Sequence, residues 1–185
     1  MQTAGSGSIV DRVMGILRLN VPTYEEVERD ENATTQAAII VGIVAVASGI
    51  GALGSDDGST ALRIIFGILS AFIGWFVFSA VAWIVGTKML PGKNTSATIG
   101  ELLRTLGFAQ APNILSVFGI IGTFGALIAF VGSIWYLVCA VIALRQALEM
   151  STGRAIAVGL IAAIISVIVL IPLALILGVS GAMTG

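Results

Sequence analysis

The sequence has 185 residues, of which 57% are hydrophobic and 10% charged, with a formal net charge of −1 and a mean hydropathy of +1.07. A water-soluble protein of this length could not bury so much apolar surface, so the composition excludes an ordinary soluble domain and indicates an integral membrane protein. The charge gives no indication of nucleic-acid binding, and the absence of histidine removes the commonest metal ligand and general base. The single cysteine, Cys139, lies in an apolar run, and we expect it to be a packing residue.

Residues 1–34 are expected to form a cytoplasmic segment with two short helices. In residues 8–19 apolar side chains recur at helical spacing, which predicts an amphipathic helix. That helix lies either in the membrane interface or against the protein's own membrane-facing surface. Pro22 is expected to end it. Thr23 followed by Glu26 matches a capping box and predicts a short acidic helix after it.

Residues 35–53 and 61–85 are predicted to be the first two membrane crossings, because each is long enough to span the hydrocarbon core and at most one charge interrupts it. A polar loop then leads to Thr98, which together with Glu101 matches a second capping box. The apolar side chains that follow have helical spacing. They predict a second interfacial helix that ends near Gly107.

Residues 112–144 are 33 residues without a charge. A single helix of that length would measure about 50 Å, against a hydrocarbon core of about 30 Å. The stretch is therefore expected to turn back at its glycines, which are Gly119, Gly122 and Gly125. Its two limbs either cross the membrane twice or form a re-entrant hairpin whose irregular backbone other helices cover.

The last predicted crossing is residues 153–178, which Pro172 is expected to kink. Residues 35–178 together are expected to form one transmembrane domain, followed by a short uncharged tail at 179–185. The resulting fold class is all-α: a polytopic membrane bundle of five helices, the third and fourth a short or re-entrant hairpin, with interfacial helices on the cytoplasmic side.

The distribution of basic residues gives the topology. With five crossings, one side of the membrane holds Arg63 alone and the other holds eight basic residues: Arg12, Arg18, Arg29, Lys88, Lys93, Arg104, Arg145 and Arg154. The positive-inside rule then places the N-terminus in the cytoplasm and the C-terminus outside. A re-entrant hairpin with four crossings predicts the same sidedness.

The predicted crossings contain few residues that could take part in catalysis or ion transport. No charged residue lies deep in any of them, which argues against an ion-coupled transporter, and no phosphate loop, nucleophile motif or metal-binding motif is present. Arg145 and Glu149 are four residues apart, and we expect an ion pair between them. Small residues recur at four-residue spacing, as at Ala155, Gly159 and Ala163; such faces either pack within the monomer or join it to another copy or another membrane protein.

Three segments resemble bacterial proteins of the Yip1-domain family. They are GILRLNVPTYEEV at 15–27, LRTLGFAQAP at 103–112, and the series IWY, IALRQA and STGRA between 134 and 155. The resemblance implies a five-helix membrane domain with a cytoplasmic N-terminus. Eukaryotic members bind prenylated Rab-type GTPases, but the acidic Tyr-Gly-Pro motif of those members is absent and their Gly-Tyr-type motif is Gly107-Phe108 here. The trafficking role is therefore not carried over.

The leading hypothesis is a non-enzymatic protein of a bacterial plasma membrane without a cofactor. It would contact lipids or proteins in membrane organisation, or as an accessory subunit. The candidate contact face comprises Arg12, Arg18, Tyr24, Glu101, Arg104, Phe108, Arg145, Glu149 and Arg154. One alternative is a channel or facilitator for an uncharged or apolar solute, with a cavity lined by Ser116, Thr123 or Ser133. Another is a lipid-modifying enzyme with its charged residues clustered at headgroup depth.

Overall fold

The computed structural model describes residues 7–55, 60–93 and 95–176, and these ranges contain helices and no strand. The elements are α1 (Ile9–Leu17), α2 (Val21–Arg29), α3 (Ala33–Gly51), η1 (Ala52–Ser55), α4 (Thr60–Ile84), η2 (Val85–Met89), α5 (Ile99–Ala109), η3 (Ala111–Ile121), α6 (Gly122–Ala147) and α7 (Thr152–Ile176). Of the irregular elements, η1 and η3 are 3-10 helices and η2 is a π-helix. The predicted all-α fold is confirmed. The predicted tail, 179–185, lies outside the described residues.

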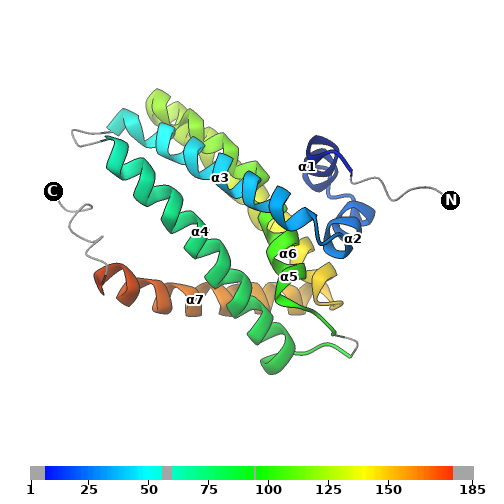
Figure 1. Cartoon of the computed structure of the whole chain (residues 1–185). Helices are drawn as coiled ribbons and strands as arrows, with labels where there is room; N and C mark the ends of the chain where they lie inside the picture. The colour runs from blue at the N-terminus through cyan, green and yellow to red at the C-terminus, as the bar shows by residue number, and fades with distance from the viewer. Residues whose placement is uncertain (1–6, 56–59, 94, 177–185) are drawn as a thin grey trace.

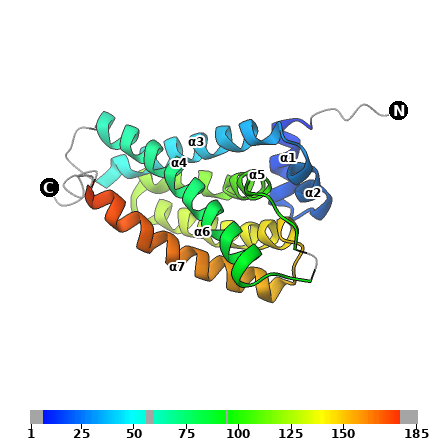
Figure 2. The same cartoon turned by 60° about the horizontal axis from the view of Figure 1, so that its bottom comes forward.

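The long helices run along one common axis of the molecule (Figures 1 and 2). α3 leads away from the end where α1 and α2 lie, and α4 returns to it. α5 with η3 leads away again, α6 returns, and α7 ends at the far end. This alternation is the order of elements that the five-crossing prediction requires.

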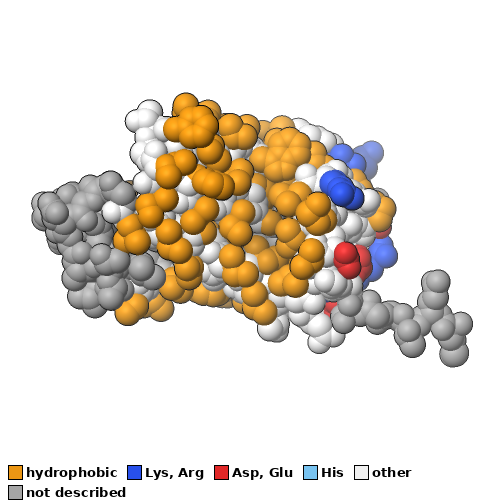
Figure 3. All heavy atoms as spheres, turned by 90° about the horizontal axis from the view of Figure 1, so that it is seen from above, with side chains coloured by type: hydrophobic (Ala, Val, Ile, Leu, Met, Phe, Trp, Pro, Cys, Tyr) orange, Lys and Arg blue, Asp and Glu red, His pale blue; other side chains and the backbone are white. Residues whose placement is uncertain are grey.

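Four stretches of the described residues are long and apolar enough to cross a membrane: Ala33–Gly51, Ile65–Met89, Ile99–Ala147 and Thr152–Pro172. Large hydrophobic side chains on these stretches are exposed, and Figure 3 shows them covering most of the visible face. Exposed apolar surface of this extent is expected where lipid is the solvent. The fold is that of a multi-pass membrane helix bundle.

The chain reverses direction within the third stretch, Ile99–Ala147. The reversal is at Gly122, whose φ of +68° lies in the region that favours glycine. The 11 residues of η3 rise about 2 Å each as a 3-10 helix, so this limb is about 22 Å long; α5 adds about 16 Å. The two together are long enough for a complete crossing, which favours two crossings over a re-entrant hairpin. The number of crossings stays a prediction.

The start of α2 differs from the prediction. Asn20, not Thr23, is the N-cap, and its side-chain oxygen accepts a hydrogen bond of 3.4 Å from the Thr23 backbone N–H. Pro22 lies in the first turn of α2, where a missing N–H costs no helical hydrogen bond. The proline therefore begins the second helix. The chain reverses just before it at Leu19, which has a φ of +58°.

The capping box of α5 is confirmed, since Thr98 and Glu101 each accept a hydrogen bond from the other's backbone N–H. α5 ends at Ala109, two residues beyond Gly107, so Gly107 lies inside the helix. A Cβ at Gly107 would lie 2.7 Å from the Ala37 Cβ and 3.1 Å from the Trp75 ring. Glycine at this position thus allows α5 to pack closely between α3 and α4.

Candidate functional site

All charged residues of the described ranges except Arg63 of α4 lie at one end of the bundle. We call it the charged end and define it by residues 8–36, 88–104 and 145–154. α1, α2 and the starts of α3 and α7 lie there (Figures 1 and 2), and Figure 3 shows the charged groups beside the hydrophobic face. This end contains all nine residues of the predicted contact face except Phe108.

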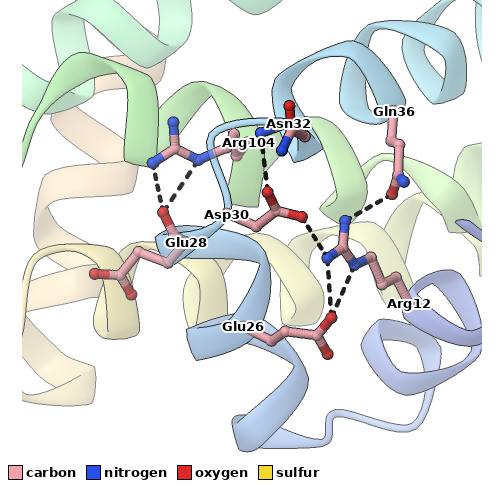
Figure 4. Close-up of polar contacts among 7 residues, drawn as sticks. All are labelled: Arg12, Glu26, Glu28, Asp30, Asn32, Gln36 and Arg104. Carbon is pink, nitrogen blue, oxygen red and sulfur yellow. Dashed lines mark hydrogen bonds and ion pairs between the residues drawn. The ribbon is translucent and has the colours of Figure 1, made fainter. Parts of the chain in front are cut away.

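Arg12 joins three elements of the charged end (Figure 4). Its Nη2 lies 2.6 Å from Asp30 Oδ2 and 2.9 Å from Glu26 Oε1, and its Nη1 donates to Gln36 Oε1 at 2.9 Å. The Arg12 residue is 2% exposed, although Val10 and Met14 on the same helix are largely exposed. A buried guanidinium is tolerated because carboxylates and an amide occupy its donors.

Both sides of this network favour their charged forms. Burial lowers the pKa of Arg12, but the hydrogen bonds that Arg12 donates to Asp30 and Glu26 outweigh burial, and the net pKa is raised. The hydrogen bond from Arg12 is the main reason that the pKa of Asp30 is lowered. The link between α1 and α2 is therefore ionic at neutral pH, and the link to α3 is a hydrogen bond from the charged Arg12 to the neutral Gln36 amide.

A second arginine holds the same C-terminal end of α2 from another helix. Arg104 of α5 is 7% exposed, and its Nε and Nη2 both donate to the backbone carbonyl of Glu28, the former at 3.0 Å (Figure 4). The last carbonyls of a helix have no partner within the helix and carry its negative dipole end. Arg104 thus caps α2 from a neighbouring helix and joins it to the bundle.

Side chains of α2 and α6 satisfy the carbonyls at the end of α1. The Tyr24 hydroxyl donates to the Ile16 carbonyl at 3.3 Å, and the Cys139 thiol contacts the same oxygen at 3.8 Å. The indole N–H of Trp135 donates to the Leu17 carbonyl at 3.1 Å. Tyr24 is fully buried, and burial raises its pKa. These contacts fix α1 against α6.

Among the carboxylates that the structure describes, Glu28 has the most strongly shifted pKa. Its pKa is raised to about 7, first by burial and then by the charge of Glu101, with Arg29 opposing and Glu149 adding to the rise. A carboxyl with this pKa is partly protonated at neutral pH. The charges of Glu101 on α5 and Glu149 in the α6–α7 turn therefore act on the ionisation of Glu28 on α2.

A partly open cavity of about 490 Å³ lies between α3, α4, η3 and α6. The polar residues of its wall are Ser48, Gln110, Asn113, Ser116 and Ser133. The hydroxyls of Ser48 and Ser116 are hydrogen-bonded to each other at 2.8 Å. Of the three residues expected to line a solute cavity, Ser116 and Ser133 do so and Thr123 does not.

The sequence model of the Yip1 domain matches residues 14–176. The chain belongs to the Yip1-domain family. The match covers every described helix from α2 to α7 and the last turn of α1, and it confirms the resemblance seen in the three segments. No match to the chain is found among curated proteins or among solved structures.

Four of the nine residues predicted to form a contact face are buried in the Yip1 domain: Arg12, Tyr24, Arg104 and Phe108. Arg12, Tyr24 and Arg104 hold α1 and α2 on the bundle through the contacts described above. Phe108 is fully buried in the core. None of the four side chains is accessible to a partner of this folded Yip1 domain.

The exposed candidates are Arg18, Arg145, Glu149 and Arg154. Arg154 donates to the Pro91 carbonyl at 2.9 Å, whereas the side chains of Arg18 and Arg145 make no hydrogen bond or ion pair with the described residues. The predicted Arg145–Glu149 ion pair is wrong. α6 ends at Ala147, and Glu149 has a φ of +47°, so the two residues do not lie on one helical face. Glu101 is half-buried in its capping box.

The sequence interpretation missed the partners of Arg12. The sequence predicts only a short acidic helix around Glu26, and it places Gln36 in the first crossing. Glu26 and Asp30 are four residues apart and thus share a face of α2. A basic residue on the preceding helix, joined to α2 by a tight turn, was the available signal for a buried ion pair.

Proposed function

We propose that this Yip1-domain protein is a non-enzymatic membrane protein that acts through protein or lipid contacts made at the charged end. It would organise membrane or serve as an accessory subunit of a membrane complex, in a bacterial plasma membrane with the charged end in the cytoplasm. The observation that carries the proposal is that the arginines have two different environments. Arg12 and Arg104 are buried and fix α1 and α2, whereas the exposed Arg18 and Arg145 make no hydrogen bond or ion pair with the described residues.

A fixed scaffold favours binding because little conformational entropy is lost when a partner docks. Arg12 and Arg104 order α1 and α2 before any partner arrives. Arg18 and Arg145 then present free guanidinium groups, which suit carboxylates of a protein or phosphates of a lipid headgroup. The small residues Ala155 and Gly159 contribute less to outside contacts, because Ala155 is buried and Gly159 faces Leu144 within the chain.

Affinity purification from gently solubilised native membranes tests this proposal. The double variant Arg18→Glu with Arg145→Glu should lose the proteins or anionic lipids that copurify with the wild type. The matched control is Arg18→Lys with Arg145→Lys, which keeps both charges and should retain most of them. Recovery of the wild type without any enriched protein or lipid, or full retention by the double glutamate variant, would contradict the proposal.

A facilitator for an uncharged solute is the second candidate, favoured by the 490 Å³ cavity with its serine and amide wall. Gly67 lines this cavity, and a Cβ there would meet nothing within 4 Å. Glycerol entry into proteoliposomes, followed by light scattering, is the measurement. Flux above that of empty liposomes, abolished by Gly67→Leu, would support a facilitator; flux equal to that of empty liposomes would exclude one for glycerol.

A further inference from the structure

A second cavity of about 370 Å³ lies between α4, α5, α6 and α7. It shares only Ala71 and Gln110 with the larger cavity described above. Its depth follows from helix geometry: Tyr136 is 11 residues from the end of α6, about 16 Å, and Ser166 is 14 residues from the start of α7, about 21 Å. With a hydrocarbon core of about 30 Å, the cavity lies near the middle of the bilayer.

Three polar side chains line this cavity without a hydrogen-bond partner among the described residues. Ser166 is 5% exposed, and its hydroxyl oxygen is buried and unpaired. Tyr136 and Gln110 also line the cavity, and neither side chain forms a hydrogen bond with the described part of the chain. Unpaired polar groups at this depth are costly, because hydrocarbon offers them no partner. Their convergence on one cavity points to a ligand.

The side chains that line the cavity restrict the chemical class of ligand that it can bind. No Asp, Glu, Lys or Arg lines the cavity, so a phosphate, carboxylate or ammonium group would be an uncompensated charge at mid-membrane depth. The hydroxyls and the amide instead match the hydroxyl and carbonyl groups of a neutral head. Trp75 and Phe78 supply the apolar remainder of the wall.

The route of entry favours a lipid over a dissolved solute. Two residues of the wall, Ala163 and Val167, are exposed on the outer face of α7, Val167 to 55%. α4 and α7 lie side by side near the charged end and diverge toward the other end (Figures 1 and 2). The cavity thus opens sideways, toward the acyl chains of the surrounding bilayer.

We propose that the cavity between α4, α6 and α7 binds the uncharged head group of a neutral lipid of the diacylglycerol type. Ser166, Tyr136 and Gln110 hydrogen-bond the hydroxyl and ester oxygens of that head, and the acyl chains extend between α4 and α7 into the bilayer. This site is independent of the contacts proposed for the charged end.

Native mass spectrometry of the purified protein tests the site with two matched probes. Dioctanoylglycerol should bind with 1:1 stoichiometry. Dioctanoyl phosphatidic acid has the same acyl chains and a charged head, and it should bind at least tenfold more weakly. Glycerol alone is the third probe, and it should not compete with dioctanoylglycerol.

Two pairs of variants locate the binding. Gly74 lines this cavity, Gly67 lines the other one, and a Cβ at either would meet nothing within 4 Å. Gly74→Leu should lower the affinity for dioctanoylglycerol at least tenfold, and Gly67→Leu should change it less than twofold. Ser166→Ala should lower it about fivefold. The control is Ser79→Ala, which removes another buried, unpaired hydroxyl outside this cavity and should have no effect.

Four results would overturn the proposal. The first is no binding of dioctanoylglycerol. The second is binding that neither Gly74→Leu nor Ser166→Ala weakens, which would place the probe on the general lipid-facing surface. The third is equal binding of phosphatidic acid. The fourth is competition by glycerol, which would make the site one for a dissolved polyol. If Gly74→Leu does not fold, the comparison of Ser166→Ala with Ser79→Ala decides alone.

Discussion

Arg12 Nη2 lies 2.6 Å from Asp30 Oδ2, and this contact joins the first helix of the protein to the end of the second. Arg12 is 2% exposed and Asp30 is 21% exposed, so water screens the pair only partly. Glu26 and Gln36 complete the coordination of the same guanidinium. The cost of removing Arg12 is therefore set by the polar groups that it would leave behind.

Replacing Arg12 with methionine should destabilise the protein by about 2–3 kcal/mol. The substitution keeps most of the side-chain volume but leaves Asp30 and Glu26 facing each other without the cation. Thermal unfolding of the purified protein measures the effect. Arg18→Met is the matched control, because Arg18 is exposed and unpaired, and its change should stay within about 0.5 kcal/mol. Equal shifts for the two variants would show that the network contributes no stability.

Glu28 should make the protein less stable as the pH rises. Its pKa is about 7 when folded and near 4.5 when unfolded, so between these values the unfolded state releases a proton that the folded state retains. The resulting penalty is absent below pH 4.5, grows as the pH rises to 7, and is constant above it. Glu28→Gln should therefore stabilise the protein at pH 8, by about 1 kcal/mol once solvent screening is allowed for.

The pH dependence separates this effect from a general change in packing. At pH 4.5 the Glu28→Gln variant and the wild type should unfold at nearly the same temperature, and their difference should grow up to pH 8. Glu25→Gln is the control, because Glu25 is an exposed partner of Arg29 and contributes least to the raised pKa of Glu28. A stabilisation by Glu28→Gln that is equal at pH 4.5 and pH 8 would rule out the electrostatic explanation.

Loss of the Arg104 cap should loosen α2 locally. Arg104→Gln removes the charge and shortens the reach to the Glu28 carbonyl, leaving a helix end without its partner. Hydrogen exchange followed by mass spectrometry should show faster exchange in residues 21–34 and unchanged exchange in α7. Arg154→Gln is the comparison, since Arg154 contacts only the Pro91 carbonyl at an exposed site. Uniformly faster exchange over the whole chain would instead indicate global destabilisation.

The apolar stretches of membrane length and the cap of α5 were predictable because they depend on local patterns. An uncharged run of membrane length predicts α3 and α4 wherever it occurs, and the Thr98–Glu101 pair needs only a four-residue segment. The partners of Arg12 lie up to 24 residues away, and hydrophobic periodicity contains no information about which charges meet. The same limit applies to Gly107, since a glycine that ends a helix and a glycine that admits a neighbouring helix look identical in sequence.

The sequence pattern also does not predict the 3-10 geometry of η3. One close contact between backbones explains how η3 packs against α3. At Gly51 a Cβ would lie 2.0 Å from the backbone carbonyl oxygen of Ser116, so α3 and η3 touch through their backbones there. Gly51→Ala should cost at least about 2 kcal/mol, because backbone cannot move aside as a flexible side chain can. At Gly67→Ala, where the Cβ meets nothing, stability should be unchanged or rise by up to about 1 kcal/mol. Thermal unfolding of the two alanine variants compares them directly, and a Gly51→Ala variant as stable as Gly67→Ala would contradict the packing of η3 against α3.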